Sequence, residues 1–208
     1  MTSSKKITRQ TVSLFHKKIK EAKRIAISGH MNPDGDCVGA CLGLYTYILD
    51  LDGEKQVDLL LEPISEKFLF LKYAEKITQE KTGEEPYDLY IALDCSDTGR
   101  LGEFRQYFEE AASTICVDHH ISNQGFGDLT FVIPDASSTC EILYDIFEEK
   151  KMSFDTAQCL YLGIVHDTGV FKHSNTTRRV MEIAGALIEK GVRPDFIIDE
   201  TFYKKTYI

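Results

Sequence analysis

The 208-residue sequence lacks tryptophan, contains only five prolines and has no long hydrophobic run. Its longest mostly apolar stretch, residues 38–49, is shorter than the roughly 20 residues that a membrane-spanning helix requires. The charged N-terminus is not followed by the apolar core of a signal peptide. Low-complexity segments, internal repeats and linkers rich in proline, glycine or serine are also missing. We therefore expect a single, cytoplasmic domain that does not bind membranes.

Positive charge is scarce as well. Lysine and arginine total 24 against 33 aspartates and glutamates, which gives a formal net charge of −9. A long duplex is bound through a basic face that neutralises its phosphates, so this composition argues against such a partner. Short anionic ligands remain compatible with it if a bound cation neutralises their charge.

The six cysteines lack any CxxC pair and lie within apolar stretches, which predicts reduced, packed thiols rather than disulfides or a zinc framework. They are Cys37, Cys41, Cys95, Cys116, Cys140 and Cys159.

Short apolar segments alternate with helical patterns along the chain. Strands are predicted over residues 24–28, 56–61, 88–93, 114–117 and 129–133. Helices are predicted over residues 12–22, 38–49, 66–72, 101–112, 139–150, 155–166, 178–190 and 195–203. This alternation predicts an α/β fold with a doubly wound, mainly parallel sheet and a helical C-terminal third.

Polar side chains follow the predicted strands at the point where each strand ends. They are His30, Asp34, Asp36, Asp94, Asp118, His119 and His120, joined by Asp167 at the end of an apolar helix. Ligands of open α/β sheets bind outside the carboxyl ends of the strands, so we expect these side chains to converge. Two like charges about 4 Å apart repel by roughly 1 to 4 kcal/mol, which bound divalent cations would offset.

The number and type of these ligands indicate two cations that share a bridging carboxylate, roughly 3.5 to 4 Å apart. Imidazole and carboxylate ligands without thiolate favour Mn²⁺, with Fe, Co, Mg or Zn as weaker candidates.

Each motif alone has a simpler interpretation. The segment from Asn32 to Asp36 has an ordinary turn composition, and Asp36 could cap the following helix. Arg100 could contact a substrate phosphate or be a solvated loop residue. Ser138 precedes a helix, where capping competes with phosphate binding. Asp118 is suited to accept a hydrogen bond and orient a histidine.

Five successive segments resemble the motifs of the DHH phosphoesterases, in particular the branch of oligoribonucleases that also act as 3′-phosphoadenosine 5′-phosphate phosphatases. The segments are GHMNPDGDCVGA, LDCSDTGRLG, VDHH, SSTCEILY and GIVHDTGVFKHSNT. The resemblance extends from about residue 7 to the end of the chain.

This resemblance implies how the residues divide between two Mn²⁺ ions, for which Mg²⁺ or Co²⁺ could substitute. The first ion would be held by His30, Asp34 and Asp94. The second would be held by Asp36, Asp94, His119 and Asp167. Catalysis would depend on Asp94, which bridges the ions, and on His120, which would face the scissile phosphate as a proton donor or transition-state stabiliser.

We therefore expect a phosphoesterase in which a metal-bridging hydroxide attacks phosphorus in line. By resemblance, its substrates would be short oligoribonucleotides and 3′-phosphoadenosine 5′-phosphate. The alternatives are a hydrolase of linear or cyclic dinucleotides, a family II inorganic pyrophosphatase, and a domain that binds metal and nucleotide without turnover.

The resemblance also implies a second domain. Residues 1–190 would form the catalytic domain, and residues 191–208 would begin a helical connector to a domain that contributes nucleotide contacts. A chain without that domain would bind its substrate weakly. It would also expose Phe202, Tyr203, Tyr207 and Ile208, through which a homodimer could form.

Overall fold

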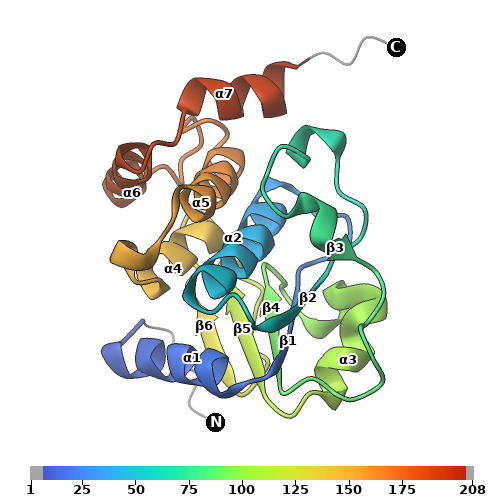
Figure 1. Cartoon of the computed structure of the whole chain (residues 1–208). Helices are drawn as coiled ribbons and strands as arrows, with labels where there is room; N and C mark the ends of the chain where they lie inside the picture. The colour runs from blue at the N-terminus through green and yellow to red at the C-terminus, as the bar shows by residue number, and fades with distance from the viewer. Residues whose placement is uncertain (1–6, 205–208) are drawn as a thin grey trace.

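A six-stranded parallel sheet forms the centre of the molecule in the computed structural model, which describes residues 7–204 (Figure 1). In chain order the strands are β1 (Arg24–Ser28), β2 (Gln56–Leu60), β3 (Ile77–Thr78), β4 (Leu89–Leu93), β5 (Thr114–Asp118) and β6 (Leu129–Val132). Their order across the sheet is β3-β2-β1-β4-β5-β6, and every neighbouring pair is parallel. The predicted α/β fold is confirmed.

The strand order reverses between β1 and β4. The chain proceeds outward from β1 through β2 to β3, and then returns to the centre at β4 before it proceeds to the other edge. Loops that follow β1 and β4 therefore lead away from each other, and this leaves a crevice at the carboxyl ends of these two strands. The fold places the segments after Ser28 and Leu93 at that crevice.

Helices cover both faces of the sheet (Figure 1). They are α1 (Arg9–Glu21), α2 (Gly35–Leu51), α3 (Arg105–Glu110), α4 (Thr139–Ile146), α5 (Phe154–Asp167), α6 (Arg178–Glu189) and α7 (Pro194–Ile198). Because side chains alternate along a strand, Ile25 and Ile27 belong to one core cluster and Ala26 to the other. The larger cluster joins the sheet to α1, α2, α4, α5 and α6, and the smaller one includes Phe108 of α3.

Several predicted elements are shorter or broken in the structure. The helix expected over residues 66–72 is only a 3₁₀ turn, Glu66–Phe68. The helix expected over 101–112 is split into a 3₁₀ segment, Thr98–Phe104, and α3, because Gly102 adopts a left-handed conformation with φ of 57°.

Three C-terminal or edge elements also differ from the prediction. The helix expected over 139–150 ends at Ile146, and the last helix is α7 followed by a π-helical turn, Asp199–Tyr203. The two-residue strand β3 was not predicted, since so short a segment has no clear periodicity.

All six cysteines are buried and free, which confirms that they are packing residues. Within residues 7–204, no helix is long and apolar enough to cross a membrane. Phe202 and Tyr203 are 40% and 68% exposed, as expected, whereas Tyr207 and Ile208 lie outside the described residues.

Glycine allows α2 and α5 to pack closely, which predicts a specific cost of substitution. A Cβ atom on Gly39 would lie 2.5 Å from the carbonyl oxygen of Cys159 and 3.0 Å from the backbone nitrogen of Gly163. Backbone atoms cannot move aside cheaply, so Gly39→Ala should lower the free energy of unfolding by about 1 to 3 kcal/mol in urea denaturation.

Gly185 is the matched control, because it also lies inside a helix but has no atom near its Cβ position. Gly185→Ala should raise the free energy of unfolding by about 0.5 to 1 kcal/mol. Equal effects of the two substitutions would contradict the close packing of α2 on α5.

Candidate metal centre

The loop after β1 supplies three of the predicted ligands. Asp34 is the N-cap of α2, and its Oδ1 accepts hydrogen bonds from the backbone N–H groups of Asp36 and Cys37, each at 3.1 Å. The alternative in which Asp36 caps the helix is therefore wrong. Asp36 instead lies in the first turn of α2, where it is completely buried.

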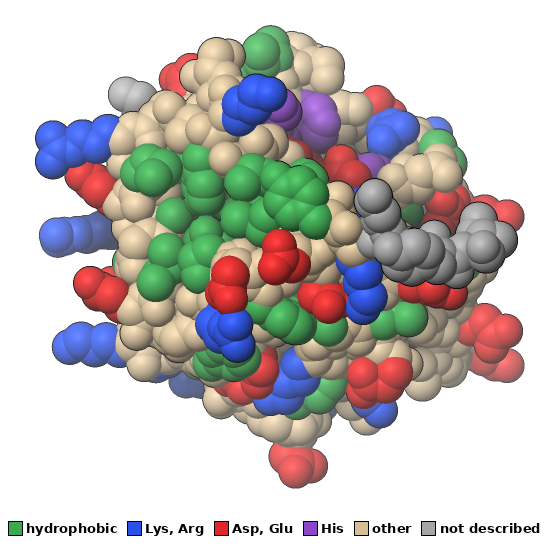
Figure 2. Space-filling view, turned by 90° about the horizontal axis from the view of Figure 1, so that it is seen from above, with side chains coloured by type: hydrophobic (Ala, Val, Ile, Leu, Met, Phe, Trp, Pro, Cys, Tyr) green, Lys and Arg blue, Asp and Glu red, His purple; other side chains and the backbone are tan. Residues whose placement is uncertain are grey.

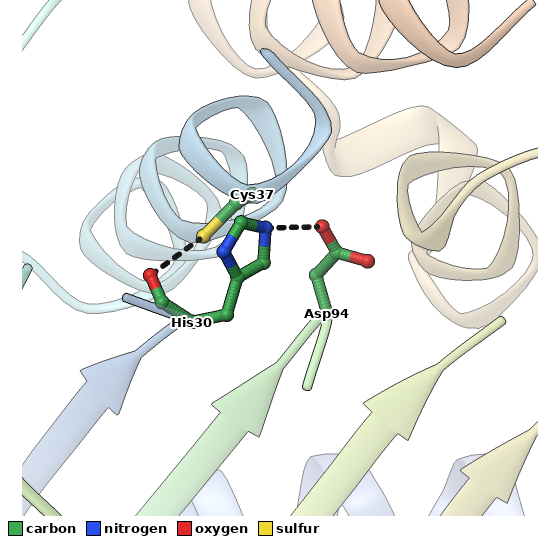
Figure 3. A group of neighbouring side chains, drawn as sticks. All are labelled: His30, Cys37 and Asp94. Atoms are coloured by element: carbon green, nitrogen blue, oxygen red, sulfur yellow. Dashed lines mark hydrogen bonds and ion pairs between the residues drawn. The ribbon is translucent and has the colours of Figure 1, made fainter. Parts of the chain in front are cut away.

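Asp94 lies at the end of β4, between two groups of side chains. Its Oδ2 is 3.4 Å from Nε2 of His30 (Figure 3), and its Oδ1 is 3.5 Å from Nε2 of His119 and 3.6 Å from Nδ1 of His120. Asp94 is 2% exposed and has a φ of 56°. Aspartate tolerates this left-handed conformation better than most residues, although the conformation is strained. Oδ2 of Asp94 thus faces His30, whereas Oδ1 faces His119 and His120.

The first group consists of His30, Asp34 and Oδ2 of Asp94. Nε2 of His30 is 3.7 Å from Oδ1 of Asp34, and its Nδ1 donates to the carbonyl oxygen of Met31 at 2.8 Å. This hydrogen bond leaves Nε2 to face the carboxylates. Nη2 of Arg100 is 3.1 Å from Nδ1 of His30, so the structure brings Arg100 to the edge of this group.

The second group surrounds His119. Its Nε2 is 3.1 Å from Oδ2 of Asp167, 3.5 Å from Oδ1 of Asp94 and 4.0 Å from Oδ2 of Asp36. These carboxylates come from the start of α2, the end of β4 and the end of α5. Both groups together contain all six predicted ligands: His30, Asp34, Asp36, Asp94, His119 and Asp167.

The donor atoms of both groups fit divalent cations. Ligand atoms about 2.1 Å from an octahedral cation lie about 3 Å from one another, and the distances above range from 3.1 to 3.7 Å except for the 4.0 Å pair. All of these donors are imidazole nitrogens or carboxylate oxygens, which suit Mn²⁺ and similar ions.

Cys37 is a nearby sulfur that the sequence analysis did not include. Its Sγ, Nε2 or Nδ1 of His30 and an oxygen of Asp94 lie within 4.8 Å of one another (Figure 3). Burial, together with Cys41, raises the pKa of the Cys37 thiol well above its ordinary value. The thiol is therefore neutral, and it points to the carbonyl oxygen of His30 at 4.0 Å.

Protons on the histidines and on Asp36 offset part of the negative charge concentrated in this cluster. Burial, with Asp94 and Asp167 nearby, raises the pKa of Asp36 well above its ordinary value. Burial opposes the charged form of His30, but hydrogen bonds with Asp34 and Asp94 outweigh it and raise the pKa to about 11. His119 behaves alike, with a pKa of about 10, because Asp167, Asp36 and Asp94 outweigh its burial.

His120 is held separately by a buried acid. Its Nδ1 donates to Oδ1 of Asp118 at 2.7 Å, and the other oxygen of Asp118 accepts from Nδ2 of Asn123 at 2.7 Å. Asp118 is completely buried, whereas the His120 side chain is 42% exposed. Asp118 therefore orients His120, as the sequence predicts, and within the described part of the chain Nε2 of His120 has no hydrogen-bond partner. Asn123 was missed because its contact with Asp118 depends on the turn after β5.

The N-terminus of α4 contributes a further contact that sequence analysis missed. The backbone N–H groups of Thr139 and Cys140 donate to the Asp36 carboxylate at 2.6 and 3.0 Å, and the Thr139 hydroxyl donates to Oδ1 of Asp94 at 3.0 Å. For Ser138 the structure shows the helix capping that the sequence analysis offered beside phosphate binding. Ser138 is completely buried, and its hydroxyl caps α4 by accepting from the N–H of Glu141.

Two glycines leave room for side chains at the site, one for Asp36 and one for the neighbouring His166. A Cβ atom on Gly163 would lie 2.5 Å from Oδ1 of Asp36, and one on Gly35 would lie 2.1 Å from the ring of His166. His166 was not predicted to be a ligand, and its ring packs against Phe68 and Phe202 instead. Figure 2 shows histidine and acidic side chains next to one another on the upper face of the molecule.

A family model described as the DHH family, N-terminal domain, matches residues 24–164, a range that includes five of the six predicted ligands. The chain belongs to the DHH family. It is 31% identical over 185 residues to the bifunctional oligoribonuclease and PAP phosphatase NrnA of Bacillus subtilis (strain 168). That match covers 86% of this chain and 55% of the relative, so the chain spans about half the length of such relatives.

Solved structures share the fold of this DHH chain. An exopolyphosphatase-related protein from Bacteroides fragilis superposes with a TM-score of 0.86 at 23% identity, over 99% of this chain and 63% of that one. The exonuclease RecJ bound to manganese superposes with a TM-score of 0.52 at 14% identity, over 93% of this chain and 54% of that one. At these identities the likeness concerns the fold alone.

The Asp118–His120 pair predicts a change in a titration. The hydrogen bond with Asp118 is the main cause that raises the pKa of His120. Asp118→Asn removes the negative charge that stabilises the imidazolium, so the His120 midpoint should move to lower pH in an NMR titration of the metal-free DHH chain. An unchanged or higher midpoint, in a variant whose circular dichroism shows the native fold, would contradict the assigned pairing.

Proposed function

We propose that this DHH chain is a divalent-metal-dependent phosphoesterase that hydrolyses short oligoribonucleotides and 3′-phosphoadenosine 5′-phosphate. The observation that carries the proposal is the position of Asp94 between the two groups: its Oδ2 lies 3.4 Å from Nε2 of His30, and its Oδ1 lies 3.5 Å from Nε2 of His119. The printed name of the Bacillus subtilis relative, an oligoribonuclease and PAP phosphatase, supports the choice of substrates.

In this proposal the chain holds two Mn²⁺ ions, and Mg²⁺ or Co²⁺ could replace them. His30, Asp34 and Asp94 would hold the first, and Asp36, Asp94, His119 and Asp167 the second. Bound ions of this kind lower the pKa of a water molecule and neutralise charge that develops on phosphoryl oxygens. The manganese in the RecJ structure supports this choice of metal.

His120 would supply a proton to the leaving oxygen. Asp118 binds Nδ1, which fixes the ring and raises the pKa of His120, so that the exposed Nε2 carries a transferable proton. A positioned histidine of this kind contributes about 10² to 10⁴-fold to a rate. Arg100, next to His30, would contact a substrate phosphate through its guanidinium group.

We also propose that residues 1–190 form the catalytic domain and that residues 191–208 begin a connector to further nucleotide-binding structure. In the described part of this region, Phe202 packs on His166 next to Asp167. A broad hydrophobic area lies on the same face as the histidine and acidic side chains (Figure 2).

A cytoplasmic location of the protein would suit short oligoribonucleotides and 3′-phosphoadenosine 5′-phosphate as substrates.

The direct test compares four substrates with and without Mn²⁺: a diribonucleotide, 3′-phosphoadenosine 5′-phosphate, a cyclic dinucleotide and pyrophosphate. Metal-dependent hydrolysis of the first two supports the proposal. Preference for the cyclic dinucleotide or for pyrophosphate would replace it with one of the alternative hydrolases. Binding of nucleotide and Mn²⁺ with no product from any substrate would indicate a non-catalytic domain.

The proposed bridging role of Asp94 predicts unequal effects of two substitutions. Wild-type chain should bind two Mn²⁺ ions in equilibrium dialysis with elemental analysis. Asp94→Ala should abolish both, because Asp94 belongs to both groups, whereas Asp36→Ala should chiefly weaken the second. One ion per wild-type chain, or two ions retained by Asp94→Ala, would refute the bridge.

His120 should affect turnover without affecting metal content. His120→Ala should lower kcat by about 10²-fold or more while the number of bound Mn²⁺ ions stays the same. His119→Ala serves as the matched comparison, since it removes a proposed ligand from the neighbouring position. Equal loss of metal in both variants would show that His120 is a ligand rather than a proton donor.

A further inference from the structure

Thr139 contacts two of the proposed metal-binding carboxylates at once. Its backbone N–H donates to Oδ2 of Asp36 at 2.6 Å, and its hydroxyl donates to Oδ1 of Asp94 at 3.0 Å. The two acids come from α2 and β4, and Thr139 is the first residue of α4. Thr139 is completely buried, so water does not compete for either hydrogen bond.

We propose that Thr139 is a positioning residue, which orients Asp94 relative to Asp36 and thereby sets the affinity of the chain for divalent cations. This inference rests on the proposed function, because it assumes that the two carboxylates bind metal. Its role concerns the second group above all, since Oδ1 of Asp94 is the oxygen that faces His119.

The hydrogen bond restricts how the Asp94 carboxylate can turn. Oδ1 of Asp94 lies 3.5 Å from His119 and 3.6 Å from His120, at nearly equal distances. The Thr139 hydroxyl engages one lone pair of this oxygen from the α4 side. Without that hydroxyl, the carboxylate could rotate toward His120 and away from Asp36, with which it would hold the second proposed cation.

Capping of α4 does not account for the Thr139 hydroxyl. Ser138 already supplies the side-chain cap of this helix, at 3.1 Å from the N–H of Glu141. The contact with Asp36 uses the backbone of Thr139, so a change of side chain leaves it available. Substitution by valine therefore removes the Asp94 contact alone, at almost constant shape.

The experiment measures Mn²⁺ affinity by electron paramagnetic resonance of free Mn²⁺, with the whole chain. Removal of a residue that orients a metal ligand typically weakens affinity about 10 to 100-fold. Thr139→Val should show a loss of this size, whereas Thr139→Ser keeps a hydroxyl and should bind within a few-fold of wild type. Thr46→Val is the matched control, because the Thr46 hydroxyl is buried on α2 and has no hydrogen-bond partner among residues 7–204. It should bind Mn²⁺ as wild type does.

If Thr139→Val fails to fold, Thr139→Ala and Thr139→Ser give the same comparison, since they differ only by the hydroxyl. Equal Mn²⁺ affinity of the variants with and without the hydroxyl would overturn the role of Thr139 and leave the proposed function intact. A wild-type chain that binds no Mn²⁺ would instead overturn the proposed function itself.

Discussion

Repulsion among the carboxylates at one edge of the sheet is the constraint around which this structure is built. Asp36 and Asp94 are at most 2% exposed, and Asp167 joins them from α5. Such groups cannot all be charged in a buried site unless positive charge or hydrogen-bond donors balance them. His30, His119 and the N-terminus of α4 supply part of that balance. Divalent cations would supply it more completely.

The packing of the helices serves this cluster. Gly39 lets α2 approach the backbone of α5, and Gly163 leaves the space that the Asp36 carboxylate occupies. The turn after Asp167 contains Val170 and Phe171, both with positive φ, which is unfavourable for a β-branched or bulky residue. Strained backbone of this kind persists where the surroundings hold it in place, and it is common at functional sites.

The gathering of most of the predicted ligands could be foreseen from one rule, and only Asp167, at the end of α5, does not follow a strand. Parallel strands that end just before His30, Asp94 and His119 present those residues at a single edge of the sheet. Thr139 and Asn123 could not be found in this way. The Thr139 contact joins residues 45 positions apart, and its second donor is a backbone N–H, which has no sequence signature. The helix expected over residues 66–72 is only the turn Glu66–Phe68, because an apolar pattern seven residues long does not by itself stabilise an α-helix.

The central claim is that Asp94 joins two cation sites. Anomalous diffraction at the manganese edge, on crystals of the whole chain grown with Mn²⁺, tests it most directly. The account predicts two peaks roughly 3.5 to 4 Å apart, one next to each oxygen of Asp94. A single peak, peaks distant from Asp94, or a peak coordinated by Cys37 would contradict it.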